Sequence, residues 1–104
     1  MHALLAALAD PVRFEIVELL ATGDRTVGEI AERFPVSGPA ISRHLRVLRE
    51  AGLATYRHDA QRRVYRLEPA AFEQLGTWTT QLERAWRTRF DALGQHLDHK
   101  KGRS

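Results

Sequence analysis

The beginning, the end and the buried face of one helix are all marked within residues 37–52. Ser37 is a favoured N-cap, because its hydroxyl can accept a hydrogen bond from a free backbone N–H of the first turn. Pro39 fits that turn, where its fixed φ suits a helix. Gly52 can adopt the left-handed backbone conformation that ends a helix. The sequence therefore predicts a helix at about residues 38–51.

This predicted helix has one apolar face and one basic face. Ile41, Leu45 and Leu48 recur at intervals of four and three residues, so they form a stripe that faces a core. The opposite face carries small or polar side chains, namely Pro39, Ser42, Arg43, Arg46 and Glu50. Arginine can bind the guanine edge through two hydrogen bonds and serine can contact bases or phosphates, so this face suits a DNA major groove. A solvated basic surface is the alternative.

Positive charge is concentrated in the same part of the chain. Residues 37–66 carry seven arginines against two acidic residues, whereas residues 1–36 carry three arginines against six acidic residues. The whole chain has a formal net charge of only +3. A basic segment of this kind is typical of a face that binds nucleic acid, and an acidic partner or a membrane surface is a weaker alternative.

Length and composition further limit the kinds of protein that this chain can be. The 104 residues predict a single domain over 1–104, at a size where dimerisation often completes the core. The absence of cysteine excludes disulfides and thiolate metal sites. The apolar run 3–9 is too short for a signal peptide or a membrane span, so we expect a cytoplasmic protein without a membrane partner. No cofactor is expected. An enzyme is disfavoured, because Ser42 and His44 lie two residues apart on a helix and cannot face each other.

Two helices are predicted near the N-terminus. Residues 3–9 are all Ala or Leu and are too few for a stable helix alone, so they must pack on another element. Asp10 as N-cap and Pro11 as first residue mark the second helix, which continues to Thr22-Gly23. The leucines on one side of the first helix are Leu4, Leu5 and Leu8. The predicted apolar side of the second helix is Val12, Ile16, Leu19 and Leu20, broadened by Phe14 and Val17.

A third helix and a short turn lead directly into the 38–51 helix. Thr26 and Glu29 have the spacing of a capping box, in which each side chain bonds the other residue's backbone N–H. The turn at 35–37 is short, and two short helices joined in this way have helix-turn-helix geometry. The predicted buried side of the third helix is Val27, Ile30, Ala31 and Phe34.

After Gly52 the pattern changes to that of two short strands. β-branched and aromatic residues alternate with polar ones on both sides of a turn at 59–61, so we predict a hairpin at about 53–67. Arg57, Arg62 and Arg63 flank its tip, where a DNA backbone would pass beside the 38–51 helix. The alternative is an edge hairpin whose arginines prevent aggregation.

The last predicted helix, about 70–97, is too long for its own domain to cover. Its large apolar side chains recur every three or four residues for about seven turns. We interpret this stripe, together with the first helix, as a dimer interface. The predicted interface residues are Leu4, Leu5, Leu8, Trp78, Leu82, Trp86, Phe90 and Leu93. The alternative is a helix that folds back onto its own domain.

Several separated motifs occur in a fixed order. They are Leu8-Ala9-Asp10-Pro11-x-Arg13, Thr26-Val27-Gly28-Glu29-Ile30-Ala31, Val36-Ser37-x-x-Ala40-Ile41-Ser42-x-His44-Leu45 and Arg63-Val64-Tyr65-x-Leu67. Through them, over about residues 4–97, the chain resembles the ArsR (ArsR/SmtB) family of bacterial winged helix-turn-helix transcriptional regulators. The resemblance implies a mainly α-helical fold in which four helices precede a small β-hairpin and a fifth helix follows. It also implies a homodimer built from the first and last helices.

The resemblance further implies how such a dimer binds double-stranded DNA. The two recognition helices, here about 38–51, would enter successive major grooves, and the wings, here about 53–67, would lie on the flanking backbone. By this carry-over, the residues at the groove are Ser37, Gly38, Pro39, Ser42 and Arg43, and those near phosphates are His44 and Arg46. Family members are mostly repressors released by an inducer or a metal. We therefore expect a repressor that binds an inverted-repeat operator, near its own gene or a neighbouring operon. Whether a small-molecule inducer releases it stays open.

The metal sites known in this family lack their ligands here. The stretch that holds cysteines in some members reads Thr26-Val27-Gly28-Glu29-Ile30, and the positions of a second known site are Pro69, Ala71, Leu82 and Ala85. The segment Trp86-Arg87-x-Arg89-Phe90-Asp91 resembles a metal-independent branch, so we expect no metal. His96 and His99, spaced i and i+3, are the remaining weak candidates. A nickel- or zinc-responsive regulator therefore stays an alternative, as does a protein-interaction module whose DNA affinity is incidental.

Overall fold

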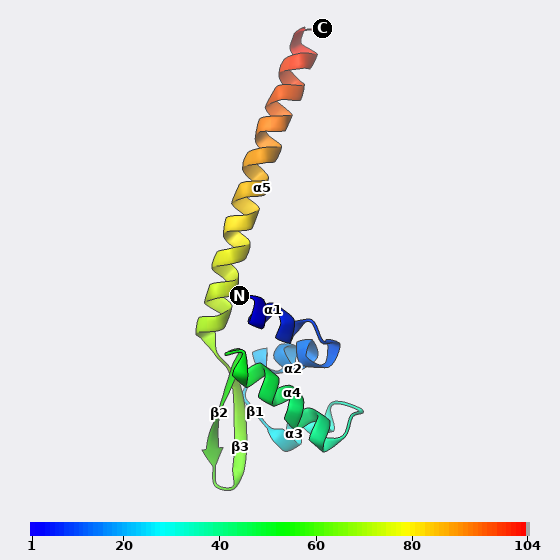
Figure 1. The fold of residues 1–104 in the computed structure, drawn as a ribbon, viewed down its shortest axis with the longest axis vertical. Helices are drawn as coiled ribbons and strands as arrows, with labels where there is room; N and C mark the ends of the chain where they lie inside the picture. The colour runs from blue at the N-terminus through cyan, green and yellow to red at the C-terminus, as the bar shows by residue number, and fades with distance from the viewer. Residues whose placement is uncertain (104) are drawn as a thin grey trace. The chain divides into compact units, whose positions relative to one another are not determined.

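The computed structural model describes the backbone of residues 1–103 and the side chains of residues 1–94. The elements in chain order are α1 (His2–Leu8), α2 (Pro11–Ala21), β1 (Arg25–Thr26), α3 (Val27–Glu32), α4 (Gly38–Glu50), β2 (Ala54–Asp59), β3 (Arg62–Leu67) and α5 (Pro69–Arg103) (Figure 1). The chain forms two compact units, Met1–Phe72 and the segment from Glu73 onward.

The predicted helix starts at Asp10 and Thr26 are confirmed. The Asp10 carboxylate accepts hydrogen bonds from the backbone N–H groups of Val12 and Arg13, at 2.9 and 3.0 Å. At α3, the Thr26 hydroxyl accepts from the Glu29 N–H at 3.1 Å, while the Glu29 carboxylate accepts from the Thr26 N–H at 3.0 Å. These bonds satisfy N–H groups that have no partner inside the helix.

Both ends of α4 also follow the sequence. The Ser37 hydroxyl accepts from the Ala40 N–H at 3.3 Å. Gly52 has φ +83°, and its N–H bonds the carbonyl of Arg49 while the Leu53 N–H bonds that of Leu48. This pair of bonds is a Schellman motif, which ends the helix one residue earlier than predicted and turns the chain into the hairpin.

The core of the N-terminal unit lies where α2, α3 and α4 meet the sheet. Its fully buried side chains are Ile16, Ile30, Ile41, Leu45, Leu48 and Leu53. Val17 is buried as predicted, but Phe14 is 51% exposed, because it lies on the outer side of α2. Val27 and Ala31 on α3 and Phe34 just after it are only half-buried, since this helix is short and rests on the core mainly through Ile30.

The sheet has three strands instead of the predicted two. β2 and β3 form the expected antiparallel hairpin, with Tyr56 opposite Tyr65 and Asp59 opposite Arg62. The additional strand, β1, pairs with the other edge of β3 and gives the order β1-β3-β2. The connection between β2 and β3 is the two residues Ala60 and Gln61, and Ala60 has the left-handed φ of +57°.

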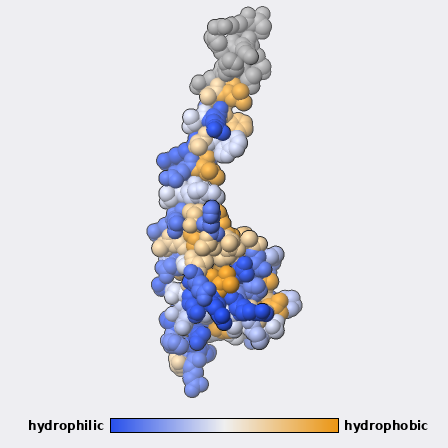
Figure 2. Space-filling model, viewed as in Figure 1, coloured by the Kyte–Doolittle hydropathy of each residue, from blue (hydrophilic) through white to orange (hydrophobic). Residues whose placement is uncertain are grey.

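The last helix is longer than predicted. α5 begins at Pro69, as expected, but continues to Arg103 instead of ending near residue 97, because no proline interrupts the remaining residues. Leu82, Trp86, Phe90 and Leu93 are exposed along it, and apolar surface is visible on this helix in Figure 2. No helix in the described part of the chain is long and apolar enough to cross a membrane.

Candidate nucleic-acid interface

The outward face of α4 carries the residues that the sequence placed at the groove. Ser37, Gly38 and Pro39 are exposed at its N-terminal end, and Ser42, Arg43 and Arg46 are exposed along it. The buried Ile41, Leu45 and Leu48 fix which way this face points. The structure therefore brings six of the predicted residues onto one surface of one helix.

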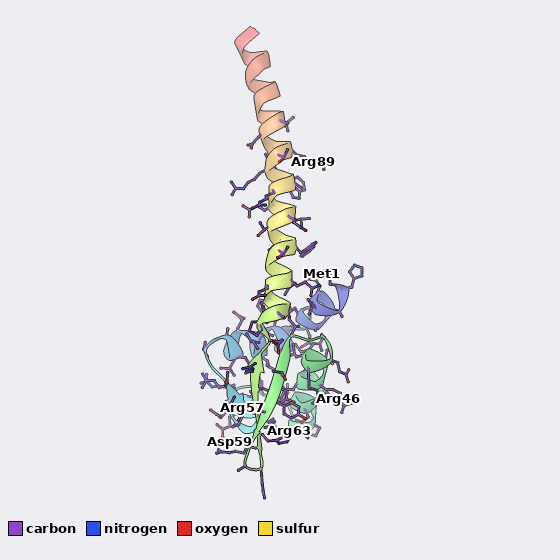
Figure 3. The ribbon with its side chains drawn as sticks, turned by 90° about the vertical axis from the view of Figure 1, so that its left-hand side faces the viewer. Met1, Arg46, Arg57, Asp59, Arg63 and Arg89 are labelled. Atoms are coloured by element: carbon purple, nitrogen blue, oxygen red, sulfur yellow. The ribbon has the colours of Figure 1, made fainter. Side chains whose placement is uncertain are left out.

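Two of the three predicted hairpin arginines are available to an anion. Arg62 and Arg63 are exposed on β3, and neither forms an ion pair with any side chain in residues 1–94. Arg57 differs, because its guanidinium donates to the Asp24 carboxylate at 2.8 Å. Figure 3 shows Arg57 and Arg63 on the hairpin and Arg46 on α4. Arg57 is thus engaged by its own protein, which the sequence could not reveal because Asp24 is 33 residues away.

His44 faces the protein instead of the outward surface of α4. Its Nδ1 lies 3.9 Å from the Asp10 carboxylate and 3.4 Å from the Arg13 guanidinium. The Arg13 side chain also donates to the carbonyls of Ala7 and Ala6, at 2.7 and 3.3 Å. His44 is therefore better placed as a packing residue between α2 and α4 than as a phosphate ligand.

The carboxylate of Asp10 is stabilised in its charged form. The hydrogen bond from the Arg13 backbone N–H is the main cause that holds the pKa of Asp10 below its usual range, and the nearby charges of His44 and Arg13 act in the same direction. The bond from the Val12 N–H adds to the effect. Asp10 thus serves both as the cap of α2 and as the anion beside the Arg13 and His44 side chains.

A basic hollow lies between α4, the start of α3 and the hairpin. One cavity of about 190 Å³ is lined by Val27, Ser42, Leu45, Arg46, Arg49, Arg63 and Tyr65. A neighbouring one of about 450 Å³ is lined by Thr26, Val27, Gly28, Ser42, Gln61, Arg62 and Arg63. Sequence reasoning missed Arg49, because its position in the last turn of α4 reads equally well as a favourable charge at the helix C-terminus.

The wing tip is electrostatically connected to the start of α3. The backbone hydrogen bond from Thr26 is the main cause that lowers the pKa of Glu29, and the charges of Arg25 and Arg62 contribute. Arg62 also lines one cavity together with Thr26, Val27 and Gly28 at the start of α3. This cavity of about 450 Å³ is lined by two arginines and no acidic side chain.

The predicted dimer residues differ in how much surface they offer. Leu4 is 5% exposed, since α1 packs it into the core of its own unit, so it has little area left for a partner. Leu5, Leu8 and Trp78 are half-buried. Trp86 and Phe90 are 57% and 66% exposed, and their ring centroids lie 6.1 Å apart.

The histidine pair on the last helix lies outside the described side chains. The side chains described end at residue 94, before His96 and His99. Among the side chains of residues 1–94, no three histidine or carboxylate groups come together as a metal site would require.

Helices α2, α3 and α4 surround one core, and α3 and α4 form a helix-turn-helix. With the basic exposed face of α4 and the hairpin beside it, this fold defines a winged helix-turn-helix DNA-binding domain. Residues 10–56 match the family described as bacterial regulatory proteins of the arsR family. The chain belongs to this ArsR family and is a DNA-binding transcriptional regulator, as the sequence motifs predicted.

Curated relatives are similar in sequence over most of the chain. The HTH-type transcriptional regulator Rv2034 of Mycobacterium tuberculosis is 45% identical over 92 residues, which are 88% of this chain and 83% of that protein. The transcriptional repressor SdpR of Bacillus subtilis is 36% identical over 78 residues, 75% of this chain and 87% of the repressor. Among solved structures, an ArsR-like transcriptional regulator from Rhodococcus sp. RHA1 matches with a TM-score of 0.77 and 30% identity, over 90% of this chain and 89% of that one.

Proposed function

We propose that the protein is a repressor that acts in the cytoplasm and binds an inverted-repeat operator as a homodimer. An operator near its own gene, which would make it autoregulatory, is part of this proposal. The observation that carries this proposal is the exposed basic face of α4 beside the equally basic β3 edge of the hairpin. Bound at a promoter, such a dimer would occlude it. The repressor name of SdpR supports this direction of regulation.

In this proposal, contacts to bases and contacts to the backbone come from different residues. Ser42 and Arg43 select bases, with Ser37, Gly38 and Pro39 close to the groove edge. Arg46, Arg62 and Arg63 contact phosphates and set affinity and register. His44 and Arg57, which the protein engages through Asp10 and Asp24, have at most an indirect part.

The exposed stripe on α5 supports the homodimer. Large contiguous apolar patches are rare on monomeric proteins, and Leu82, Trp86, Phe90 and Leu93 follow one another at helical spacing. A second copy would cover this stripe with the same stripe, as two-fold symmetry requires. The two recognition helices then demand half-sites about one helical turn, roughly 34–36 Å, apart.

The proposal is tested by titrating the protein against the DNA upstream of its own gene and against an unrelated duplex, at two salt concentrations. We expect preference for the upstream DNA and an affinity that falls steeply with salt, because arginines displace counterions from phosphates. Equal binding to both duplexes would contradict sequence-specific repression. Full affinity for a single half-site would contradict the dimer.

The signal that releases the repressor is proposed to be a small molecule or the level of the protein itself, with no resident metal. The positions of the family's two known metal sites carry Thr26, Gly28, Pro69, Ala71, Leu82 and Ala85. Adding Zn²⁺ or Ni²⁺ to the titration, with His96→Ala/His99→Ala as the matched variant, tests the alternative. A metal effect that the double substitution removes would establish a histidine site.

A further inference from the structure

We propose that Arg49 and Tyr56 complete an anion site with Arg46 and Arg63, which binds one backbone phosphate of DNA between α4 and the hairpin. We call these four residues the arginine clamp. The inference rests on the proposed function, because its ligand is operator DNA. It adds one phosphate ligand, Arg49, and one positioning residue, Tyr56, to the residues identified from the sequence.

The Tyr56 ring is the centre of the clamp. The guanidinium carbon of Arg49, from α4, lies over this ring at 5.4 Å from its centroid, and that of Arg63, from β3, lies over it at 5.0 Å. Both distances are in the range of cation–π attraction. One aromatic side chain on β2 therefore holds two arginines that come from different elements.

The ring itself is well fixed. Tyr65 lies directly opposite Tyr56 on β3, with ring centroids 5.3 Å apart, and the His58 ring meets Tyr56 edge to face at 5.5 Å. Tyr65 is buried and belongs to the core. The position of the two guanidinium groups is thus set by the sheet and not by the arginines alone.

The cavity that these arginines line lacks a counter-charge. It has a volume of about 190 Å³, and its polar lining residues are Arg46, Arg49 and Arg63 with Ser42 and Tyr65. No carboxylate lines it, and within residues 1–94 none of the three arginines forms an ion pair. Three cations that line one cavity without an anion repel one another, so a bound anion stabilises the arrangement.

A phosphodiester is the anion that fits this site best. Guanidinium groups bind phosphate oxygens through paired, charge-assisted hydrogen bonds, and a serine hydroxyl is a further donor. The cavity also borders Ser42 on the exposed face of α4, where the proposed major-groove contacts are made. A phosphate on the groove edge would therefore reach the clamp while the helix reads bases.

Tyr56 contributes by ordering the arginines before DNA arrives. A free arginine loses rotamer entropy when it binds, and holding it in place beforehand reduces that cost. The aromatic ring is the group that matters, so phenylalanine should replace tyrosine and leucine should not. This contrast separates a positioning role from a need for the phenol hydroxyl.

The test compares four variants of the full chain by fluorescence anisotropy with the upstream duplex over a range of salt. For Arg49→Gln we expect about tenfold weaker binding and a salt slope reduced by about one unit. Tyr56→Leu should weaken binding severalfold, whereas Tyr56→Phe should stay within about twofold. Arg66→Gln is the matched control, because Arg66 is an exposed β3 arginine that alternates to the face opposite Arg63.

Single neutral methylphosphonate linkages in the duplex locate the phosphate without altering the protein. The intact chain should lose affinity at one linkage per half-site, and Arg49→Gln should be indifferent at that same linkage. Arg49→Gln binding no worse than Arg66→Gln, or no linkage whose effect the variant removes, would overturn the clamp. If the intact chain shows no preference for the upstream DNA, the proposed function has failed; if that preference holds while Arg49→Gln has no effect, only the clamp has failed.

Discussion

Single arginines on α4 and on the hairpin should affect DNA binding in different ways. Arg43→Ala should cost about 1–3 kcal/mol and relax base preference at one operator position, because an exposed arginine on the groove face can bind a guanine edge. Arg62→Ala should weaken binding to all sequences alike and reduce the salt slope by about one unit. Anisotropy titrations against a set of single-base operator variants measure both effects. An Arg62→Ala variant with a new preferred sequence would show that the hairpin reads bases.

The charge on Asp10 should make part of the stability depend on pH. Its pKa is lowered in the folded chain, so its contribution is fully present above the pKa of the unfolded chain, about 4, and is lost as pH falls through the lowered value. Asp10→Asn keeps a side chain that can cap α2 but removes the charge.

Urea unfolding of the intact chain and of Asp10→Asn, at neutral pH and at successively lower pH, measures this contribution. The stability difference between the two should be largest at neutral pH and should decrease as pH falls through the lowered pKa of Asp10. A difference that grows on acidification would contradict the assignment of a lowered pKa.

Among the elements, the turn of the hairpin stores backbone strain at one residue. Ala60 has φ +57°, a conformation that glycine adopts without the clash between Cβ and the carbonyl oxygen. We expect Ala60→Gly to stabilise the protein by about 0.5–1 kcal/mol, after the larger entropy of glycine in the unfolded chain is subtracted. Thermal unfolding checks this, with Gln61→Gly as the control. Destabilisation by Ala60→Gly would show that the turn tolerates its alanine without strain.

The elements that sequence predicted well are those whose signals are local. The caps at Asp10, Thr26 and Ser37 and the stripe on α4 depend on residues within one or two turns, so their physical causes can be read directly from the chain. The strand β1 has only two residues and is a strand only because it pairs with β3, 38 to 40 residues later. Two residues show no periodicity, so the sequence pattern does not predict this strand.

Only the part of the candidate site that lies on one helix could be predicted from the sequence. The exposed face of α4 follows from its buried face, because 100° per residue fixes one from the other. The engagement of Arg57 by Asp24, the inward position of His44 and the Tyr56 ring beneath two arginines each join residues from separate elements. These three features require the packed fold, which pattern and spacing alone do not supply.

For the molecule as a whole, the apolar stripe of α5 predicts an assembly that one substitution can break. Trp86→Glu would place a charge within the interface and should convert the homodimer to monomers, with loss of high-affinity binding to the full inverted repeat. Light scattering coupled to size exclusion measures the mass. Thr88→Glu is the matched control, because Thr88 is also exposed but lies about 200° around the helix from Trp86. A dimer that survives Trp86→Glu would contradict the proposed interface.

One guanidinium joins three helices of the N-terminal unit. Arg13 belongs to α2, closes the carbonyl end of α1 through Ala6 and Ala7, and reaches the ring of His44 on α4. A rotation of α1 must therefore either break these bonds or move the DNA-facing helix with it. α1 and α4 are thus coupled through the Arg13 side chain as well as through their own direct packing. A molecule that pulled on α1 would act on DNA binding without approaching the DNA.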